Sequence, residues 1–538
     1  MTSQDGTFRR SWRQRTAVFA GLAVAASGLA GCGFSSRAVV PGAVVVAIYE
    51  SEVTDVLPGM SQGSDLDYAL FTPLTRYDPR ARKLTDEVAQ SITTEDQQHW
   101  RIRIKRGWTF HDGSPVTARS FADSWNTTAD PANVMTNNAE MSVFAGYAEM
   151  NPPDGEKKGR QPVTALSGVH VVDDYALDVT LSAPNRLLPY QLSSTAFAPI
   201  TPAAAADPKK FATRPVGNGP FRAANGGWEL GEQDIALERY PGYAGRPAGL
   251  ANVDLRVYQS AGTLFTDFQA DQIDVAFLDG DEFSVAADEE PGDLVDAALP
   301  SLVYLGFPLY DKRFANAGIR RAISLAIDRK SIVDGLLEGD GSVADGLGPA
   351  MLAGAEKVRC PCGYDPGAAR AALRAAGGWQ GELVLQTYAG PETERVLQAI
   401  ANQLHDNLGI DARIETVPIS QLYEGLDSHS AKGPFMLYSG AAYPHVYAQV
   451  KALLSKDGEL NMTTFADPEF QHDLAAAGAA GTDARAGTLA AQAASVGLGK
   501  IPLTPLYYPK AGILHESGIT GVVPELLGAP NLASLRKP

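Results

Sequence analysis

The chain has 538 residues and a formal net charge of −17. Its first 31 residues carry four arginines and one aspartate, so the remaining 507 residues carry a charge of −20. This acidity argues against the basic surface that binding to nucleic acid or to anionic lipid requires. The hydrophobic fraction of 45% is ordinary for a globular protein, and the length predicts about two or three domains.

The amino-terminal segment has the layout of an export signal. Four arginines come before an apolar stretch at 17–31, which is too short to span a bilayer as a permanent helix. The stretch ends in Leu29-Ala30-Gly31 and is followed by Cys32, an arrangement that resembles a bacterial lipobox. That resemblance implies cleavage before Cys32 and acylation of this residue; the alternative is an ordinary signal peptide with an incidental cysteine. We therefore expect a signal peptide at 1–31 and a lipid anchor and tether at 32–43.

Beyond the tether, the pattern of apolar residues predicts strands and helices that alternate irregularly. Predicted strands lie at 44–49, 99–104, 169–181, 235–239, 252–258, 302–307, 383–388, 411–417 and 434–439. Predicted helices lie at 117–127, 315–338, 368–376, 393–408 and 474–496. The sequence therefore predicts an α/β fold without a repeat of fixed period.

Two stretches are predicted to be irregular and exposed. Residues 150–162 contain Asn151-Pro152-Pro153-Asp154-Gly155 and a cluster of lysine and arginine. Residues 279–294 are acidic and could bind a cation, but they lack the glycine and the terminal glutamate of a calcium loop. A solvated loop is therefore expected at 279–294.

Two further cysteines form the segment Cys360-Pro361-Cys362. No second cysteine pair is present to complete a tetrahedral metal site, and no metal or other cofactor is expected. In an oxidising exterior the two thiols could pair as a small disulfide or remain free. Either state predicts only a local structure of this loop.

The candidates for catalytic chemistry are weak. Gly59-Met60-Ser61-Gln62-Gly63 fits the Gly-x-Ser-x-Gly nucleophile elbow of α/β-hydrolases. That elbow needs a strand running directly into it, whereas the predicted strand ends at Tyr49 and Pro58 precedes the motif, so a turn is expected. The eight histidines include no His-x-x-x-His pair. We therefore expect that the protein is not an enzyme.

One segment at 104–118, Ile-Lys-Arg-Gly-Trp-Thr-Phe-His-Asp-Gly-Ser-Pro-Val-Thr-Ala, predicts a strand, an Asp-Gly turn and a helix capped by Thr117. His111 within it is expected to support the turn rather than to bind a ligand. Other distinctive segments lie at 73–78, 84–89, 217–221, 268–275, 319–330, 364–373 and 501–508. In this order they resemble the peptide/nickel class of ABC-transporter solute-binding proteins, the dipeptide- and oligopeptide-binding family. The resemblance extends over roughly residues 44–515.

This resemblance implies a two-lobed periplasmic-binding-protein fold, hinged around a central cleft. Lobe I is expected at 44–258, with an extra subdomain at about 78–184. Lobe II is expected at 259–507, and 508–538 is expected to return to lobe I. The chain would then cross between the lobes near 258–260 and near 506–508. Ligand is expected to close the lobes by hinge motion, because only a solute that contacts both lobes favours the closed state.

The resemblance also implies a ligand site in the cleft. Its expected contacts are Glu50, Ser51, Trp228, Phe307, Tyr438, Ser439, Gly440, Ala441, Ala442 and Tyr443. Peptide-binding members pair an aspartate with the amino terminus of the peptide, and Ala442 stands where that aspartate is expected. A buried ammonium needs a partner, so another carboxylate, such as Glu50 or Glu52, would serve, or the ligand has no free amine there.

The function implied is that of an extracytoplasmic lipoprotein, a monomer on the outer face of the cell membrane. It would capture short peptides and deliver them to ABC permease subunits that work with cytoplasmic ATPases, with no role for nucleic acid. One alternative keeps the fold and changes the ligand to haem, a metal chelate, a sugar or another small solute. A second alternative is a ligand sensor without transport.

Overall fold

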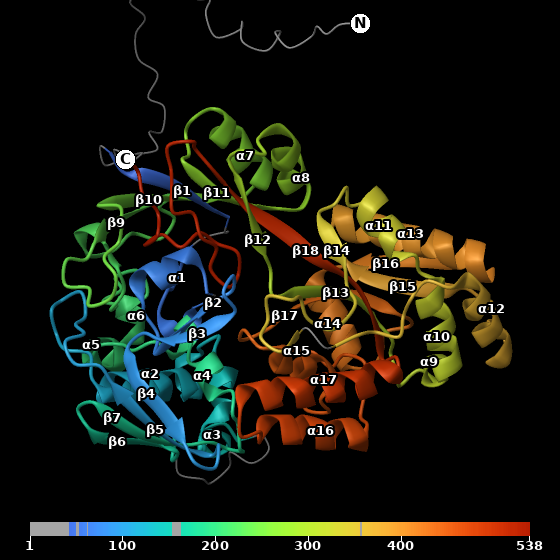
Figure 1. The fold of residues 1–538 in the computed structure, drawn as a ribbon, viewed down its shortest axis with the longest axis horizontal. Helices are drawn as coiled ribbons and strands as arrows, with labels where there is room; N and C mark the ends of the chain where they lie inside the picture. The colour runs from blue at the N-terminus through green and yellow to red at the C-terminus, as the bar shows by residue number, and fades with distance from the viewer. Residues whose placement is uncertain (1–41, 50–52, 62, 153–162, 356–357) are drawn as a thin grey trace, which may run out of the picture. The chain divides into compact units, whose positions relative to one another are not determined.

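The computed structural model describes residues 42–49, 53–61, 63–152, 163–355 and 358–538. Its largest element is a 12-stranded mixed sheet with the strand order β16-β15-β17-β13-β18-β11-β1-β10-β9-β8, in which β12 and β14 also pair with β18 (Figure 1). These strands are β1 (Val44–Tyr49), β8 (Phe221–Ala223), β9 (Asp234–Arg239), β10 (Asn252–Tyr258), β11 (Val275–Asp279), β12 (Leu294–Ala298), β13 (Ser301–Gly306), β14 (Gly341–Val343), β15 (Leu383–Tyr388), β16 (Ala412–Val417), β17 (Phe435–Gly440) and β18 (Leu503–His515).

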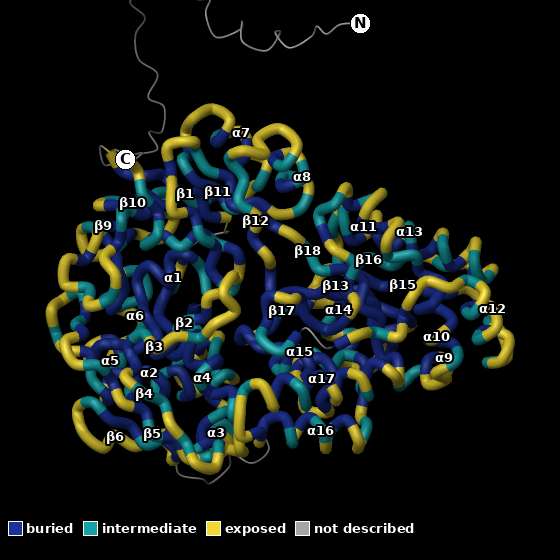
Figure 2. Tube along the Cα trace, in the orientation of Figure 1, coloured by how far each residue is buried: buried dark blue, intermediate teal, exposed yellow. Residues whose placement is uncertain are grey.

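Helices accompany this sheet and two smaller ones, and about half of these helices overlap the ranges that the sequence predicts as helical. They are α1 (Asp65–Leu70), α2 (Ala118–Ala129), α3 (Tyr147–Met150), α4 (Leu188–Gln191), α5 (Pro202–Ala206), α6 (Pro208–Phe211), α7 (Ala261–Gln269), α8 (Gly280–Glu289), α9 (Lys312–Ala315), α10 (Ala317–Ala326), α11 (Arg329–Gly335), α12 (Pro366–Ala375), α13 (Pro391–Leu408), α14 (Ile419–Asp427), α15 (Val446–Leu454), α16 (Pro468–Gly478) and α17 (Asp483–Gly499). Figure 2 shows that the strands between them are largely buried, and every residue of β13 is buried.

The strand β18 belongs to both halves of the large sheet. Its first residues pair with β13, where Leu503 is opposite Gly306. Its last residues pair with β11, where His515 is opposite Val275, and with β12. The long red arrow of β18 in Figure 1 therefore runs from one half of the sheet into the other. We call β1 and β8–β12, with the other described segments up to residue 298, the first half. The second half is β13–β17 with the described segments between residues 301 and 502.

The second link between the halves is the short connection from β12 to β13, at Leu299–Pro300. Because β11 pairs with β1 and β12 pairs with β18, residues 275–298 are part of the first half. The sequence alone put this crossing at 258–260, where in fact β10 leads into α7. We therefore propose that the first crossing lies at 299–300 and that lobe I extends to about residue 298.

A separate four-stranded antiparallel sheet lies within the range 78–184 expected for an extra subdomain. Its order is β4 (Ala89–Thr94), β5 (His99–Ile104), β7 (Ala176–Thr180) and β6 (Val169–Asp173). The single strand predicted at 169–181 is wrong, because the chain turns at 174–175 to form the β6–β7 hairpin. The Asp173 carboxylate accepts a hydrogen bond from the backbone N–H of Tyr175 at 2.7 Å, which stabilises this turn.

Two long predicted helices are each interrupted by a residue that starts a new helix. The range 315–338 contains the end of α9 and the helices α10 and α11, and Asn316 and Asp328 accept hydrogen bonds from the first turns of α10 and α11. The range 474–496 contains the end of α16 and most of α17, and Thr482 caps α17 in the same way. A side chain that caps a helix favours the start of a new helix over the continuation of the previous one, and each of these ranges is divided for this reason.

The acidic stretch 279–294 is not the solvated loop that its charge predicts. Residues 280–289 form α8, and Phe283 and Ala286, three positions apart, are buried on one face of this helix. The apolar spacing therefore decides the structure, and the acidic residues occupy the outer faces. Of the other stretch predicted to be irregular, 150–162, residues 153–162 lie outside the described part of the chain.

The Asp-Gly turn of the segment 104–118 is held by His111. The ring Nδ1 accepts a hydrogen bond from the backbone N–H of Gly217 at 3.1 Å, and Nε2 lies 3.2 Å from the carbonyl of Gly219. Burial lowers the pKa of His111 to about 4, which keeps the ring neutral and suited to this pair of contacts. His111 therefore joins two loops, as the sequence predicts.

The carboxyl-terminal segment returns to the first half through a buried ion pair. Arg76, in the strand β2 (Thr75–Asp78), which pairs with β3 (Lys83–Asp86), donates a hydrogen bond to Glu525. The Glu525 side chain is only 5% exposed, and the Arg76 guanidinium also lies over the ring of Tyr68 at 5.1 Å. An ion pair this well buried leaves a costly unpaired charge if one partner is removed.

We expect Glu525→Ala to lower the free energy of unfolding by about 3 kcal/mol, because Arg76 would remain buried without its partner. The matched control is Glu229→Ala, since Glu229 pairs with Arg214 at the surface and both side chains are more than half exposed. The control should cost less than about 1 kcal/mol. Chemical denaturation followed by circular dichroism measures both, and equal losses would contradict the role given to Glu525.

Candidate functional site

Two cavities lie beside the segments that link the two halves of the sheet. The first has a volume of about 660 Å³ and is lined by Asp296, Ala297, Ala298, Leu299, Ser342, Val343, Asp345, Gly348, Pro349, Ala350, Met351, Ala355, Val358, Tyr508, Pro509, Lys510 and Ala511. The second has a volume of about 340 Å³ and shares Leu299, Pro509 and Lys510 with the first. Both cavities therefore change if the two links move.

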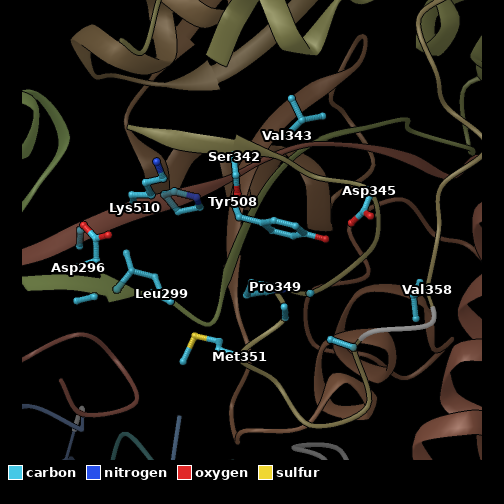
Figure 3. Close-up of a pocket in the computed structure, with 17 residues that line it drawn as sticks. Asp296, Leu299, Ser342, Val343, Asp345, Pro349, Met351, Val358, Tyr508 and Lys510 are labelled. Carbon is cyan, nitrogen blue, oxygen red and sulfur yellow. The ribbon is translucent and has the colours of Figure 1, made fainter. Parts of the chain in front are cut away.

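The first cavity is mostly apolar, and residues of one loop, within 345–355 and at 358, form one wall. In Figure 3 the ring of Tyr508 extends across the cavity toward Asp345, and Lys510 lies at the other end, near Asp296. The loop is fixed to this ring, because the backbone N–H of Gly346 donates a hydrogen bond to the Tyr508 hydroxyl at 3.1 Å. Burial raises the pKa of Tyr508 well above its ordinary value, so its hydroxyl stays protonated.

Arg329 holds the segment that follows this loop, and a disulfide closes a local turn there. The Arg329 guanidinium donates hydrogen bonds to the carbonyl of Cys362 at 2.8 Å and to that of Pro505 at 3.1 Å. The sulfur atoms of Cys360 and Cys362 are bonded to each other. Of the two states that the sequence left open for these cysteines, the structure therefore has the disulfide.

The second cavity combines acidic and aromatic side chains from both halves. Its charged lining residues are Asp279, Asp340, Glu392 and Lys510, and its aromatic ones are Tyr388, Tyr438 and Tyr507. Burial, with a further contribution from the carboxylate of Glu392, raises the pKa of Asp340 to about 6. Burial raises the pKa of Asp279 as well. This cavity therefore holds negative charge in a partly desolvated place.

The two halves also touch each other away from the links. Tyr77 donates a hydrogen bond to the carbonyl of Met351 at 2.7 Å. Arg186 forms an ion pair with Asp483 at 2.7 Å. The ring of Tyr190 packs edge-on against that of His445, with centroids 5.3 Å apart. The loop that lines the first cavity therefore contacts the first half directly, through Met351.

The segment 438–443 places its residues in different surroundings. Tyr438 is 46% exposed and lines the second cavity, and its hydroxyl lies 2.6 Å from that of Ser301. Ser439 points the other way, is buried and accepts a hydrogen bond from Gln449 at 2.6 Å. Gly440 is half-buried, and the N–H of Ala441 donates to the carbonyl of Pro300. Ala442 is exposed and Tyr443 is buried.

The other expected contacts are not at the cavities. Trp228 is only 3% exposed, and its indole N–H donates to the carbonyl of Val53 at 3.1 Å, within the core of the first half. Phe307 is fully buried and packs against Phe314. Neither side chain presents surface to a ligand in this structure. Glu50 and Ser51, like the suggested substitute Glu52, lie outside the described residues.

Sequence reasoning missed most of the residues that line the cavities. Asp279, Asp340, Glu392 and Lys510 are far apart along the chain and lie at the end of β11, before β14, at the start of α13 and within β18. The sequence places Asp279 in the acidic stretch 279–294, which predicts a solvated loop, and it singles out none of the other three residues. The partners of Asp279 follow from the strand order, which the sequence alone does not determine.

The described residues contain little that resembles a catalytic or metal site. Ser61, of the Gly-x-Ser-x-Gly motif, follows a 3-10 turn rather than a strand and shares a hydrogen bond with the hydroxyl of Thr195. Within the ranges that the structure describes, no three His, Cys, Asp or Glu side chains lie close enough to hold one metal ion. In the same ranges, no helix has the length and the apolar composition needed to cross a membrane.

The comparison with protein families decides the class. The model of the bacterial extracellular solute-binding proteins, family 5 (middle region), matches residues 83–461, which is more than half of the chain. The chain belongs to this family. The family consists of solute-binding proteins that work outside the cytoplasm, which agrees with the resemblance read from the segments between 44 and 515.

Family 5 relatives and structures of the same fold cover most of the chain. The dipeptide-binding protein DppE of Bacillus subtilis is 24% identical over 81% of this chain and 80% of its own length. The oligopeptide-binding protein OppA of the same species is 22% identical over 84% of each chain.

The structure of the murein tripeptide-binding protein MppA, in an unliganded open form, has a TM-score of 0.78 and 19% identity over 92% of this chain and 97% of its own. Peptide-bound OppA of Listeria monocytogenes has a TM-score of 0.69 and 20% identity over 92% and 99%. The fold is therefore the two-lobed α/β fold expected, and the cavities lie beside the two segments that link the halves of its large sheet.

Phe307 is buried and Tyr438 is half exposed, so substitutions at these two positions should lower stability by different amounts. Phe307→Ala should lower the free energy of unfolding by about 3–5 kcal/mol, because it leaves a cavity in a core. Tyr438→Ala should lower it by about 1 kcal/mol or less, because half of the side chain is exposed and one hydrogen bond is lost. Urea denaturation measures both, and a large loss for Tyr438→Ala would show that Tyr438 is a core residue.

Proposed function

We propose that this family 5 protein captures short peptides outside the membrane and delivers them to an ABC importer. The observation that carries the proposal is the position of the cavities at Leu299, Pro509 and Lys510, where both lobes and both links meet. A solute bound there contacts both lobes, so it favours one relative placement of the lobes over another. The relatives named for dipeptides and oligopeptides support peptides as the solute class.

The mode of capture follows from the lining of the cavities. The apolar lining of the first cavity suits side chains of varied shape, and polar groups are few there. Main-chain hydrogen bonds to an extended peptide give affinity without strong selectivity for sequence. The protein would then accept many short peptides, with preferences set by the few charged groups near the links.

One observation favours a second candidate, in which the solute is not a peptide with a free amino terminus. Ala442 is exposed and has no acidic side chain, so it offers no partner for an ammonium group. A blocked peptide, or a different small solute such as a sugar, haem or a metal chelate, needs no such partner. This candidate keeps the same cavities and the same transport role.

We also propose that Cys32 anchors the protein to the outer face of the cell membrane. A single acyl chain gives only reversible binding, whereas two or more hold a soluble domain durably. The residues 32–43 would act as a tether for the folded part. From that position a monomer could deliver its solute to two permease subunits that work with cytoplasmic ATPases.

We expect that the mature protein, released from cells in mild detergent, carries bound peptides. Native mass spectrometry of the intact protein should give a series of adducts whose dissociation releases short peptides. A single non-peptide adduct would favour the second candidate. The absence of any adduct, together with no heat released on titration with a mixture of tripeptides, would contradict peptide capture.

We expect Cys32→Ser to release the protein into the aqueous phase when cells are extracted with Triton X-114, because the acylated thiol is lost. The unchanged protein should partition into the detergent phase and should incorporate labelled palmitate. Cys362→Ser is the matched control and should still partition into detergent. Detergent partition of Cys32→Ser would show that the anchor lies elsewhere.

A further inference from the structure

We propose that the second cavity selects a positively charged group of the ligand, the ammonium or guanidinium of a basic peptide side chain. This inference rests on the proposed peptide capture and names the class of peptide that the site prefers. It concerns the cavity lined by Asp279 and Gly280 of lobe I, by the links between the lobes, and by Asp340, Tyr388, Glu392 and Tyr438 of lobe II.

The charge of this cavity is the first reason. Its lining contains three carboxylates and a single ammonium, that of Lys510. The Lys510 ammonium already donates a hydrogen bond to the carbonyl of Gly339 at 2.9 Å. The guanidinium of Arg395, which does not line the cavity, forms an ion pair with Asp281 at 2.8 Å and interacts more weakly with Glu392. The excess negative charge is therefore available to a cation that enters the cavity.

Structural contacts explain the positions of only some of these three carboxylates. Asp279 is the N-cap residue of α8, but its side chain makes no capping hydrogen bond. Asp340 precedes β14 and caps no helix, and its carboxylate accepts a hydrogen bond from the hydroxyl of Ser284. Glu392 accepts a hydrogen bond from the Tyr507 hydroxyl at 2.5 Å. It lies in the first turn of α13, where the positive end of the helix dipole stabilises its negative charge.

The raised pKa of Asp340 shows that its charged form is destabilised in this cavity. Burial raises its pKa to about 6. The hydrogen bond from Ser284 and the charge of Lys510 act in the opposite direction. The carboxylates of Glu392 and Asp281 add to the increase. A carboxylate whose charged form is destabilised by its neighbours gains when a cation arrives. A bound ammonium near Asp340 and Glu392 would reduce the repulsion between these two carboxylates.

The aromatic lining is a second, independent reason. Tyr388, Tyr438 and Tyr507 line the same cavity, and Tyr438 is one of the few large apolar side chains that are strongly exposed among the described residues. The face of an aromatic ring attracts ammonium and guanidinium groups. Carboxylates and tyrosine rings in one recess together form the chemistry that recognises an organic cation.

A metal ion fits this place less well. No three of the acidic, histidine or cysteine side chains in the described ranges lie close enough to hold one ion, and this includes the carboxylates here. They are instead spread over a cavity of about 340 Å³. This volume lies at the low end of the range for small-molecule pockets, about 300–1,000 Å³, so it suits a single long side chain better than a whole peptide.

The test compares tripeptides and tetrapeptides of alanine in which one position at a time is lysine, acetyl-lysine or glutamate. Acetyl-lysine keeps the aliphatic stem and removes the charge. Isothermal titration of the intact mature protein should show, for at least one position, that the lysine peptide binds about tenfold or more tightly than the acetyl-lysine peptide. The glutamate peptide should bind more weakly than both.

Two isosteric variants then assign this preference to the cavity. Asp340→Asn and Glu392→Gln should each reduce the ratio of the two affinities, lysine to acetyl-lysine, to within about threefold. Glu382→Gln is the matched control, because it removes the same charge from a surface pair with Arg413 and Glu382 lines neither cavity. The control should keep the tenfold ratio, and circular dichroism checks that each variant is folded.

The outcomes separate this inference from the function on which it rests. Equal binding of the lysine and acetyl-lysine peptides at every position would overturn the inference and leave peptide capture intact. A lysine preference that survives in both cavity variants would also overturn it, because the selecting group would lie elsewhere. Failure to bind any peptide would overturn peptide capture and this inference together.

Discussion

The backbone hydrogen bonds of β18 are the constraint on which the rest of the structure depends. One continuous strand pairs with β13 at its beginning and with β11 and β12 at its end. Backbone groups of a buried strand must be paired, so β18 fixes the register of both halves of the sheet. The short link at Leu299–Pro300 runs beside it, and the two cavities lie next to these links. The proposed ligand site of this family 5 protein is therefore formed by the same segments that hold the two halves of the sheet together.

The contacts away from the links limit how the lobes can move. Tyr77, Arg186 and Tyr190 of lobe I touch Met351, Asp483 and His445 of lobe II. Met351 belongs to the loop that lines the first cavity, and Arg329 holds the segment that follows this loop, where the disulfide closes a local turn. A change in the distance between the lobes is therefore passed directly to the wall of a cavity. This is the physical requirement for a receptor whose shape depends on its solute.

The sequence predicts the fold better than it predicts the site, for identifiable reasons. The strands β1, β5, β10 and β15 lie at the predicted bounds, because each is a short run with a clear apolar pattern. The helices α10 and α11 were predicted as one because Asn316 and Asp328 cap new helices inside one amphipathic pattern. Among the described residues that the family resemblance suggested as ligand contacts, only Tyr438 lines one of the two cavities. Asp279, Asp340 and Glu392 meet only because the strand order brings their elements together, and no local pattern contains this information.

The positions of these three carboxylates at the ends of their elements have a consequence for how such receptors diversify. Asp279 follows a strand, Asp340 precedes one, and Glu392 lies in the first turn of a helix, while the cores of both lobes lie elsewhere. Residues at such places can be exchanged with little disturbance of packing. The charge of the proposed binding cavity can thus change without a change in the fold that surrounds it. A single inherited scaffold can in this way serve chemically different nutrients through a few substitutions at its loop ends.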